Sequence, residues 1–407
     1  MLFWSFSVKV EQPFLGKAGT LLFLVIVSAF PPLTTDLYLP ALPTMVEKLS
    51  TNQAMVNLTL SVYFVAYAIG LLFWGPLSEK FGRKPILMLG LGIYVVGSLL
   101  CALANQVEML IGARLIQAFG GSAVTVVATA IVKDLYDGRE REKIIATIMS
   151  LVIIAPMVAP VIGALLLKVG SWHMMFYALA GFGTMSMLLA LTYQETLQSK
   201  YTGSIIQSWG RLGVVIKNPR FLSLLAIFTI PPMTLMAFLA AGSYIYIDGF
   251  GLSEQTFSYA FAANAFCASF GPSIYMKLSQ KISVKKIITT CFILLMLCGV
   301  LTLTFGHLSP WIFASIAAPA TLMVIVTRVP GTNLMLDQQT GDTGSAVAII
   351  QFCSMIAGAT GMMLVSIRPD ELISDLGIIQ LSIGTIALVL WLLVKNKSYV
   401  INNLSKI

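Results

Sequence analysis

The segment Gly75-Pro76-Leu77-Ser78-Glu79-Lys80-Phe81-Gly82-Arg83-Lys84-Pro85 gathers charged side chains between two long apolar runs. The runs on either side, 56–78 and 86–105, are each long enough to cross a ~30 Å hydrocarbon core as a helix. Of the chain's 407 residues, 57% are hydrophobic and only 10% are charged. Because a soluble domain carries about 25% charged residues, most of this surface must face lipid. The composition excludes a soluble enzyme and predicts an all-α polytopic membrane protein.

Twelve apolar runs are predicted to be transmembrane helices, and a polar stretch separates the sixth from the seventh. Part of that stretch, 205–216, fits either an amphipathic helix at the membrane surface or an ordinary loop. We predict an N-terminal six-helix bundle over 1–193, a cytoplasmic linker over 194–220 and a C-terminal six-helix bundle over 221–407. The spans are expected near 18–42, 56–78, 86–105, 109–132, 144–168, 173–193, 221–247, 255–278, 284–306, 309–333, 344–366 and 372–394.

The two halves repeat one another. Phe30-Pro31-Pro32-Leu33-Thr34 in the first span matches Ile230-Pro231-Pro232-Met233-Thr234 in the seventh, at an offset of 200 residues. Basic loops follow the second and eighth spans at nearly the same offset. Paired repeats with a binding site at their interface are typical of secondary transporters.

The distribution of Lys and Arg predicts the orientation. With a cytoplasmic N-terminus, nearly all of the 25 basic residues lie in inner segments, and Arg328 is counted with the inner loop after the tenth span. Lys48, Lys168 and Arg368 lie outside. Both termini are therefore expected in the cytoplasm. The net charge of +8 is spread over short loops without a basic domain, so we expect no nucleic-acid binding.

Asp36 and Arg114 are the two ionisable residues that stand out deep within the predicted spans. A charge there costs ~2.5–3.5 kcal/mol, so it normally faces a cavity and has a function. We expect Asp36 to exchange a proton in response to substrate; the alternative is a structural Asp at a helix broken near Pro40 and Pro43. Arg114 stays charged and is expected to act on Asp36 or on an anionic group, or else to donate structural hydrogen bonds between helices.

The five cysteines show no CxxC spacing, and the sequence contains no P-loop. We therefore expect no metal site, no cofactor and no direct use of ATP.

The 75–85 segment resembles the cytoplasmic loop signature of the major facilitator superfamily. Glu79 stands where the family usually has Asp, and Lys80 stands where Arg is common. At the end of the fourth span, Asp134 could accept a hydrogen bond from Arg83. The segment is therefore interpreted as a cytoplasmic gating loop, and the residues that fit the signature are Gly75, Leu77, Glu79, Lys80, Gly82, Arg83 and Lys84.

Two span motifs extend the resemblance. Arg114-Leu115-Ile116-Gln117, followed by Gly120-Gly121, resembles the family's fourth-span motif, which implies a proton-coupling role for Arg114. The fifth span resembles the motif characteristic of antiporters, with some of its usual glycines replaced by Ala. The residues that carry this likeness are Pro156, Pro160 and Gly163.

A narrower likeness comes from Asp36-Leu37-Tyr38-Leu39-Pro40-Ala41-Leu42-Pro43 together with Ser171-Trp172-His173. These segments resemble the bicyclomycin/chloramphenicol-resistance branch of the drug:proton antiporters. The resemblance implies two pseudo-symmetric six-helix bundles around a cavity that opens alternately to each side.

The expected function is a proton-coupled antiporter that exports small amphipathic compounds such as drugs or antibiotics. We expect a monomer in the bacterial inner membrane. The alternatives are a dedicated exporter of a native metabolite, such as a siderophore or peptide-like product, and a non-transporting receptor or scaffold with a transporter fold. Polar residues in the spans could line the substrate cavity or instead form helix-packing hydrogen bonds: Tyr38, Asn57, Tyr63, Tyr67, Gln117, Asn264 and Gln351.

Overall fold

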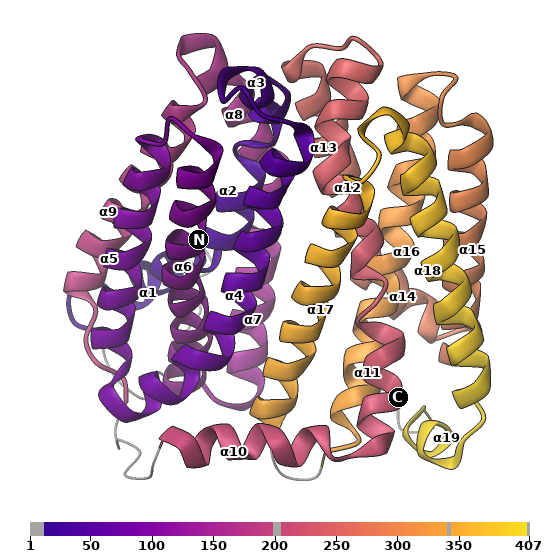
Figure 1. Cartoon of the computed structure of the whole chain (residues 1–407). Helices are drawn as coiled ribbons and strands as arrows, with labels where there is room; N and C mark the ends of the chain where they lie inside the picture. Colours follow the sequence, from indigo (N-terminus) through magenta and orange to yellow (C-terminus); the bar gives the residue numbers. More distant parts are fainter. Residues whose placement is uncertain (1–11, 198–204, 340–342, 405–407) are drawn as a thin grey trace. The chain divides into compact units, whose positions relative to one another are not determined.

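A computed structural model of the chain describes residues 12–197, 205–339 and 343–404 (Figure 1). Within these residues the chain forms helices and turns and contains no β-strand, and eleven helical segments are long and apolar enough to cross a membrane. Helices satisfy their backbone N–H and C=O groups internally, as a hydrocarbon environment requires. Large apolar side chains such as Ile69, Leu89 and Val96 are about half exposed, as lipid-facing side chains are. The predicted all-α multi-pass fold is confirmed.

Two compact units make up the chain. Unit 1 consists of the described residues up to Tyr38 together with Ala66–Ser208, and unit 2 consists of Leu39–Val65 and Trp209–Ile407. The segment 39–65 therefore groups with the C-terminal residues, although the sequence assigned it to the N-terminal bundle. The predicted boundaries at 193 and 221 stay a prediction, and part of the predicted linker lies outside the described residues.

Unit 1 is built from α1 (Gly16–Ser28), α2 (Phe30–Asp36), α5 (Arg83–Ala102), α6 (Val107–Leu135), α7 (Gly138–Val152), α8 (Ala155–Val169) and α9 (His173–Thr192). Unit 2 is built from η1 (Leu39–Ala41), α3 (Leu42–Lys48), α11 (Pro219–Phe228), α12 (Pro232–Tyr244), the π-helical turn η2 (Ile245–Gly249), α13 (Glu254–Ser269), α14 (Gly271–Ser279), α15 (Val284–Phe305), α16 (Pro310–Leu336), α17 (Thr343–Val365), η3 (Pro369–Glu371), α18 (Leu372–Val394) and α19 (Ser398–Leu404). Residues of α4 (Gln53–Phe81) and α10 (Ile205–Ile216) are divided between the units.

The Pro-Pro pairs break the first helix of each half at equivalent places. Helix α1 ends at Ser28, and α11 ends at Phe228, 200 residues later. Proline has no N–H to donate, and its ring clashes with the carbonyl four residues earlier, so each helix stops and restarts there. The offset of the sequence repeat is thus also the offset between two real helix ends.

Helix pairing inside the units repeats as well. In unit 1, α5 packs against α6 and α9, and α2 packs against α8. In unit 2, α15 packs against α16 and α18, and α12 packs against α17 (Figure 1). Each unit by itself therefore contains the same set of neighbouring spans.

Two further predicted spans are interrupted. The eighth, 255–278, forms α13 and α14, with the break at Phe270 and a proline at the second position of α14. The fifth, 144–168, divides into α7 and α8 just before Pro156, which occupies the second position of α8. Proline suits the first turn of a helix, where no N–H is needed, and it disfavours continuation from the preceding helix.

Arg328 is a correction to the sequence analysis. It lies within α16, more than two turns before that helix ends at Leu336, and not in the following loop. Counting it among the loop cations was wrong, since the predicted span 309–333 already contained it. The segment 205–216, for which helix and loop were both considered, is the helix α10, and its Val215 is buried in the core of unit 2.

Small residues let α5 and α6 approach closely. A methyl group added at Gly97 would lie 2.5 Å from the backbone nitrogen of Gln117, and one at Gly90 would lie 2.5 Å from Cβ of Ala123. Gly120 on α6 faces the backbone of Tyr94 in the same way. Close backbone contact over small residues is a common basis of helix association in membranes.

We expect Gly97→Ala to destabilise unit 1, because overpacking a close contact costs about 1–3 kcal/mol. Thermal unfolding of the purified protein in detergent should show a lower midpoint for this variant. Gly92→Ala is the matched control on the same helix, since a methyl group there meets nothing within 4 Å. An equal midpoint for both variants would refute the close contact at Gly97.

Candidate functional site

Arg114 is completely buried in unit 1, on α6. Its Nη1 donates to Gln117 Oε1 at 2.6 Å and to the backbone oxygen of Thr34 at 3.3 Å. Its Nη2 donates to the Tyr38 hydroxyl at 3.2 Å, and its guanidinium carbon lies 4.6 Å from the centre of the Tyr38 ring. A buried cation is costly unless polar groups and π-faces surround it, as they do here.

Hydrogen bonds continue from Arg114 into α5. Gln117 donates through Nε2 to Ser98 Oγ at 2.8 Å, and Ser98 donates to the backbone oxygen of Tyr94. The Tyr94 hydroxyl in turn lies 2.7 Å from Thr34 Oγ1. Helices α2, α5 and α6 are therefore joined around one cation, and Thr34, Tyr94 and Ser98 are members that the sequence analysis missed.

Asp36 is the last residue of α2 and is 4% exposed. Its Oδ1 accepts a hydrogen bond from Thr35 Oγ1 at 2.8 Å. Among the described residues it forms no ion pair with Arg114, which bonds instead to residues flanking Asp36 in sequence. The carboxyl group also sits at the carbonyl end of a helix, where the dipole disfavours negative charge.

The antiporter-like motif lies on the helix that packs against α2. Pro156 is the second residue of α8, and Pro160 and Gly163 are buried along it. Since α8 packs against α2, the motif lies on a neighbour of the helix that carries Asp36.

The proposed cavity residues have mixed surroundings. Tyr38 and Gln117 bond to Arg114. Tyr67 donates to Thr125 Oγ1 at 2.7 Å, and Asn57 donates through Nδ2 to Ser366 Oγ at 2.8 Å, so both form packing hydrogen bonds. The Asn57 Oδ1 atom is buried and accepts no hydrogen bond among the described residues. Cavity lining stays a prediction for all of them, including the buried Tyr63 and Asn264 and the half-buried Gln351.

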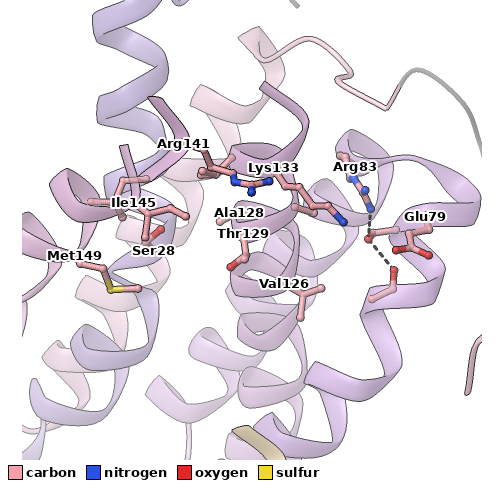
Figure 2. A pocket seen from close by; sticks show the side chains of 15 residues that line it. Ser28, Glu79, Arg83, Val126, Ala128, Thr129, Lys133, Arg141, Ile145 and Met149 are labelled. Carbon is pink, nitrogen blue, oxygen red and sulfur yellow. Dashed lines mark hydrogen bonds between the residues drawn. The ribbon is translucent and has the colours of Figure 1, made fainter. Parts of the chain in front are cut away.

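The predicted gating loop separates α4 from α5. Gly75 and Glu79 line a pocket of about 400 Å³ in unit 1 (Figure 2). Lys80 is half-buried, and Lys84 donates through Nζ to the backbone oxygen of Leu191 at 2.8 Å. Gly82 has φ +115°, a conformation that favours glycine and allows the sharp turn into α5.

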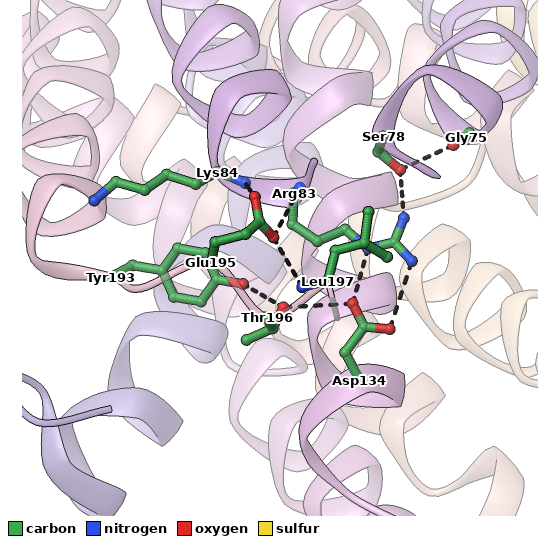
Figure 3. Close-up of polar contacts among 9 residues, drawn as sticks. All are labelled: Gly75, Ser78, Arg83, Lys84, Asp134, Tyr193, Glu195, Thr196 and Leu197. Carbon is green, nitrogen blue, oxygen red and sulfur yellow. Dashed lines mark hydrogen bonds and ion pairs between the residues drawn. The ribbon is translucent and has the colours of Figure 1, made fainter. Parts of the chain in front are cut away.

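Arg83 and Asp134 form the expected ion pair (Figure 3). Arg83 Nε donates to Asp134 Oδ2 at 2.8 Å, and only 7% and 16% of the two side chains are exposed. Arg83 Nη1 also donates to Ser78 Oγ at 2.8 Å. The pair thus connects the start of α5 to the end of α6, with α4 attached through Ser78.

Glu195, which the sequence analysis missed, caps the start of α5 (Figure 3). Its carboxylate accepts the backbone N–H of Arg83 at 3.1 Å and of Lys84 at 3.0 Å, and it also accepts the N–H of Leu197 at 2.9 Å. A methyl group at Gly82 would lie 2.6 Å from Glu195 Oε2, so glycine is needed there for space as well. The sequence signal for this role was weak: Glu195 is an acidic residue directly after the sixth predicted span, on the same predicted cytoplasmic side as the 75–85 loop.

Ser171-Trp172-His173 lies where α8 is followed by α9, and it contacts the turn between α5 and α6. Ser171 Oγ and His173 Nδ1 lie 2.8 Å apart, and His173 Nε2 lies 3.2 Å from the backbone oxygen of Ala104. Trp172 is buried and stacks on His173. In the residues that the structure describes, no group of three or more His, Cys, Asp or Glu side chains could hold a metal ion.

Replacing Glu195 by Ala should cost about 0.5–2 kcal/mol, the usual range for loss of a side chain that caps a helix start. Hydrogen–deuterium exchange should accelerate at the amides of Arg83 and Lys84. Glu108→Ala removes an exposed acid from the first turn of α6 and serves as the control. Unchanged exchange in Glu195→Ala would show that the cap does not hold the turn.

Arg83→Gln and Asp134→Asn should show an energetic coupling of about 0.5–3 kcal/mol in a double-mutant cycle, as directly bonded side chains do. The measurement is unfolding of the four proteins in detergent. Additive effects of the two substitutions would mean that the ion pair contributes no interaction energy.

Comparisons with known proteins agree with this architecture. The family model described as Major Facilitator Superfamily matches residues 23–362. Solved structures show the same fold: a mutant of the nucleoside transporter NupG has a TM-score of 0.73 at 15% identity, covering 92% of this chain and 98% of that one. The peptide transporter POT in complex with sulfate also has a TM-score of 0.73, at 14% identity, covering 95% and 97%.

Curated relatives are nearer in sequence. The uncharacterized MFS-type transporter YdgK of Bacillus subtilis is 30% identical over 346 residues, which cover 83% of this chain and 86% of the relative. A bicyclomycin resistance protein homolog of Haemophilus influenzae is 26% identical, covering 86% and 89%. The multidrug resistance protein MdtL of Klebsiella pneumoniae is 31% identical over 235 residues, covering 58% and 60%. The resemblance to the bicyclomycin-resistance branch is confirmed, and the chain belongs to the Major Facilitator Superfamily of membrane transporters.

Proposed function

We propose that this transporter exports small amphipathic compounds, including antibiotics, in exchange for protons. The observation that carries the proposal is Asp36, a carboxyl group buried within a membrane span without an ion-pair partner among the described residues. Burying an ionised carboxylate without a counter-charge costs free energy, and binding a proton removes that cost. A group of this kind can take up a proton when one conformation exposes it to water and lose it in another.

Arg114 supports the proposal through its neighbours. Three of its hydrogen bonds go to neutral acceptors, and two of these acceptors, the Thr34 backbone oxygen and the Tyr38 hydroxyl, lie on either side of Asp36 along the chain. A shift of α2 that accompanies protonation of Asp36 would change these bonds to Arg114. We therefore assign Arg114 the role of positioning the Asp36 segment, instead of pairing directly with it.

The compound class follows from the relatives. One is named for resistance to bicyclomycin and another for multidrug resistance. Drugs of many shapes require an adaptable pocket, and the 20 Met and 23 Phe residues of the chain supply flexible and aromatic apolar surface for one. The energy source in this proposal is the proton gradient.

The proposed setting is the inner membrane of a bacterium with both termini in the cytoplasm. The asymmetry of Lys and Arg between the loops supports this orientation. It places the turn between α4 and α5, with Arg83 and Asp134, on the cytoplasmic face. There the ion pair would have to open and close as the transporter changes conformation, as a gating contact does.

Asp36→Asn should abolish transport driven by a pH gradient, because the amide cannot exchange a proton. Bicyclomycin and a panel of amphipathic antibiotics would be offered to inverted vesicles that contain the protein, with empty vesicles as background. Asp370→Asn, which changes an exposed acid in the short helical turn η3 before α18, should transport like the wild type. If Asp36→Asn still takes up compounds under a pH gradient, Asp36 is not the proton-coupling residue.

A further inference from the structure

The pocket beside the gating loop has cations that the proposed transport cycle does not use. It has a volume of about 400 Å³ and is lined within unit 1 by α4, α6 and α7, together with Ser28 of α1 and Arg83 of α5. Figure 2 shows Lys133 reaching into it from the last turn of α6 and Arg141 from the first turn of α7. Two separate helices therefore direct positive charge at one volume.

The balance of charge in this pocket is positive. Arg83 lines it, but Asp134 neutralises that guanidinium. Lys133 and Arg141 have no hydrogen-bond or ion-pair partner in the part of the chain that the structure describes. Glu79 is the carboxylate among the lining residues. The unneutralised cations thus outnumber the acids, and a pocket with this balance favours an anion.

The remaining wall of the pocket is apolar. Ile145, Ile148 and Met149 follow Arg141 along α7, and Ile145 and Met149 are 41% and 62% exposed. A small inorganic anion would leave this surface uncovered. An anion attached to an apolar body would contact the cations with its charged group and the α7 side chains with the rest.

We propose that this pocket binds the phosphate group of an amphipathic molecule, with Lys133 and Arg141 as the anion-binding residues. The planar guanidinium of Arg141 can donate two parallel hydrogen bonds to phosphate oxygens, and the Lys133 ammonium supplies a point charge. The ligand is either an anionic phospholipid or a soluble phosphate ester with an apolar tail. In the proposed orientation the pocket lies at the cytoplasmic leaflet, where basic pockets between helices bind anionic headgroups.

The test titrates the purified full-length protein with three probes and counts bound molecules by native mass spectrometry. The probes are a short-chain phosphatidylglycerol, a phosphatidylcholine with the same chains, and glycerol phosphate. Wild type should prefer phosphatidylglycerol to phosphatidylcholine. The double variant Lys133→Gln with Arg141→Gln should lose about thirtyfold in phosphatidylglycerol affinity, as expected for the loss of two cations that contact an anionic headgroup.

Two further variants isolate the pocket. Lys285→Gln with Lys286→Gln removes the same charge at the start of α15 in unit 2 and should bind phosphatidylglycerol like the wild type. Lys133→Arg with Arg141→Lys keeps both charges and should retain binding, which separates charge loss from misfolding.

Binding of phosphatidylglycerol without glycerol phosphate would identify a lipid as the ligand. Binding of glycerol phosphate that depends on the same two residues would identify a soluble phosphate ester. Equal phosphatidylglycerol affinity in wild type and in the double glutamine variant of Lys133 and Arg141 would overturn the proposal. The same loss of affinity in the unit 2 control would also overturn it, as would equal binding of phosphatidylglycerol and phosphatidylcholine by the wild type. None of these measurements uses a proton gradient, so the result is independent of the proposed antiport.

Discussion

The buried guanidinium of Arg114 is the constraint on which the rest of unit 1 depends. A permanent cation that is buried within a membrane span must be surrounded by acceptors, because burial removes it from water. Gln117, the Thr34 backbone oxygen and the Tyr38 hydroxyl meet this need. Their positions in turn require the break at the end of α2 and the close approach of α5 to α6. The same break leaves Asp36 buried beside the cation's ligands without making it one of them.

A second polar network lies at the opposite end of the same helices. Glu195 holds the first turn of α5 through backbone amides, while Arg83 pairs with Asp134 at the end of α6. Helices α5 and α6 are therefore joined at both ends by hydrogen bonds and along their length by small residues. In the proposed cycle, the contacts around Arg83 are the ones that water can reach and loosen. Arg114 is completely buried, and proton binding at Asp36 would be the event that changes its contacts in that cycle.

Much of the fold could be predicted because lipid imposes a simple rule on sequence. Apolar length gave the spans, and the Pro-Pro pairs marked helix breaks that the structure places at Ser28 and Phe228. The contact between Arg83 and Asp134 could be predicted because Arg83 precedes the third span and Asp134 follows the fourth, which places both on the cytoplasmic side in the predicted orientation. Arg328 was misplaced because it was counted with the following loop by its charge alone, although it lay within the predicted span 309–333.

Contacts that depend on the direction in which a side chain leaves its helix could not be predicted from the sequence. Asp36 and Arg114 were both predicted to lie deep within their spans, yet depth alone does not decide whether two side chains face each other. Glu195 was missed because its partners are backbone amides, which carry no sequence signal. For Tyr67 and Asn57, cavity lining and helix packing both stayed open, since a polar residue in a span satisfies either description until its partner is known.

In the proposed cycle, a transported compound displaces the proton that Asp36 binds. The most direct test is proton release, measured with a pH indicator in weakly buffered detergent solution, when a transported antibiotic binds the purified protein. Wild type should release protons and Asp36→Asn should release none; equal release from both proteins would rule out this exchange at Asp36.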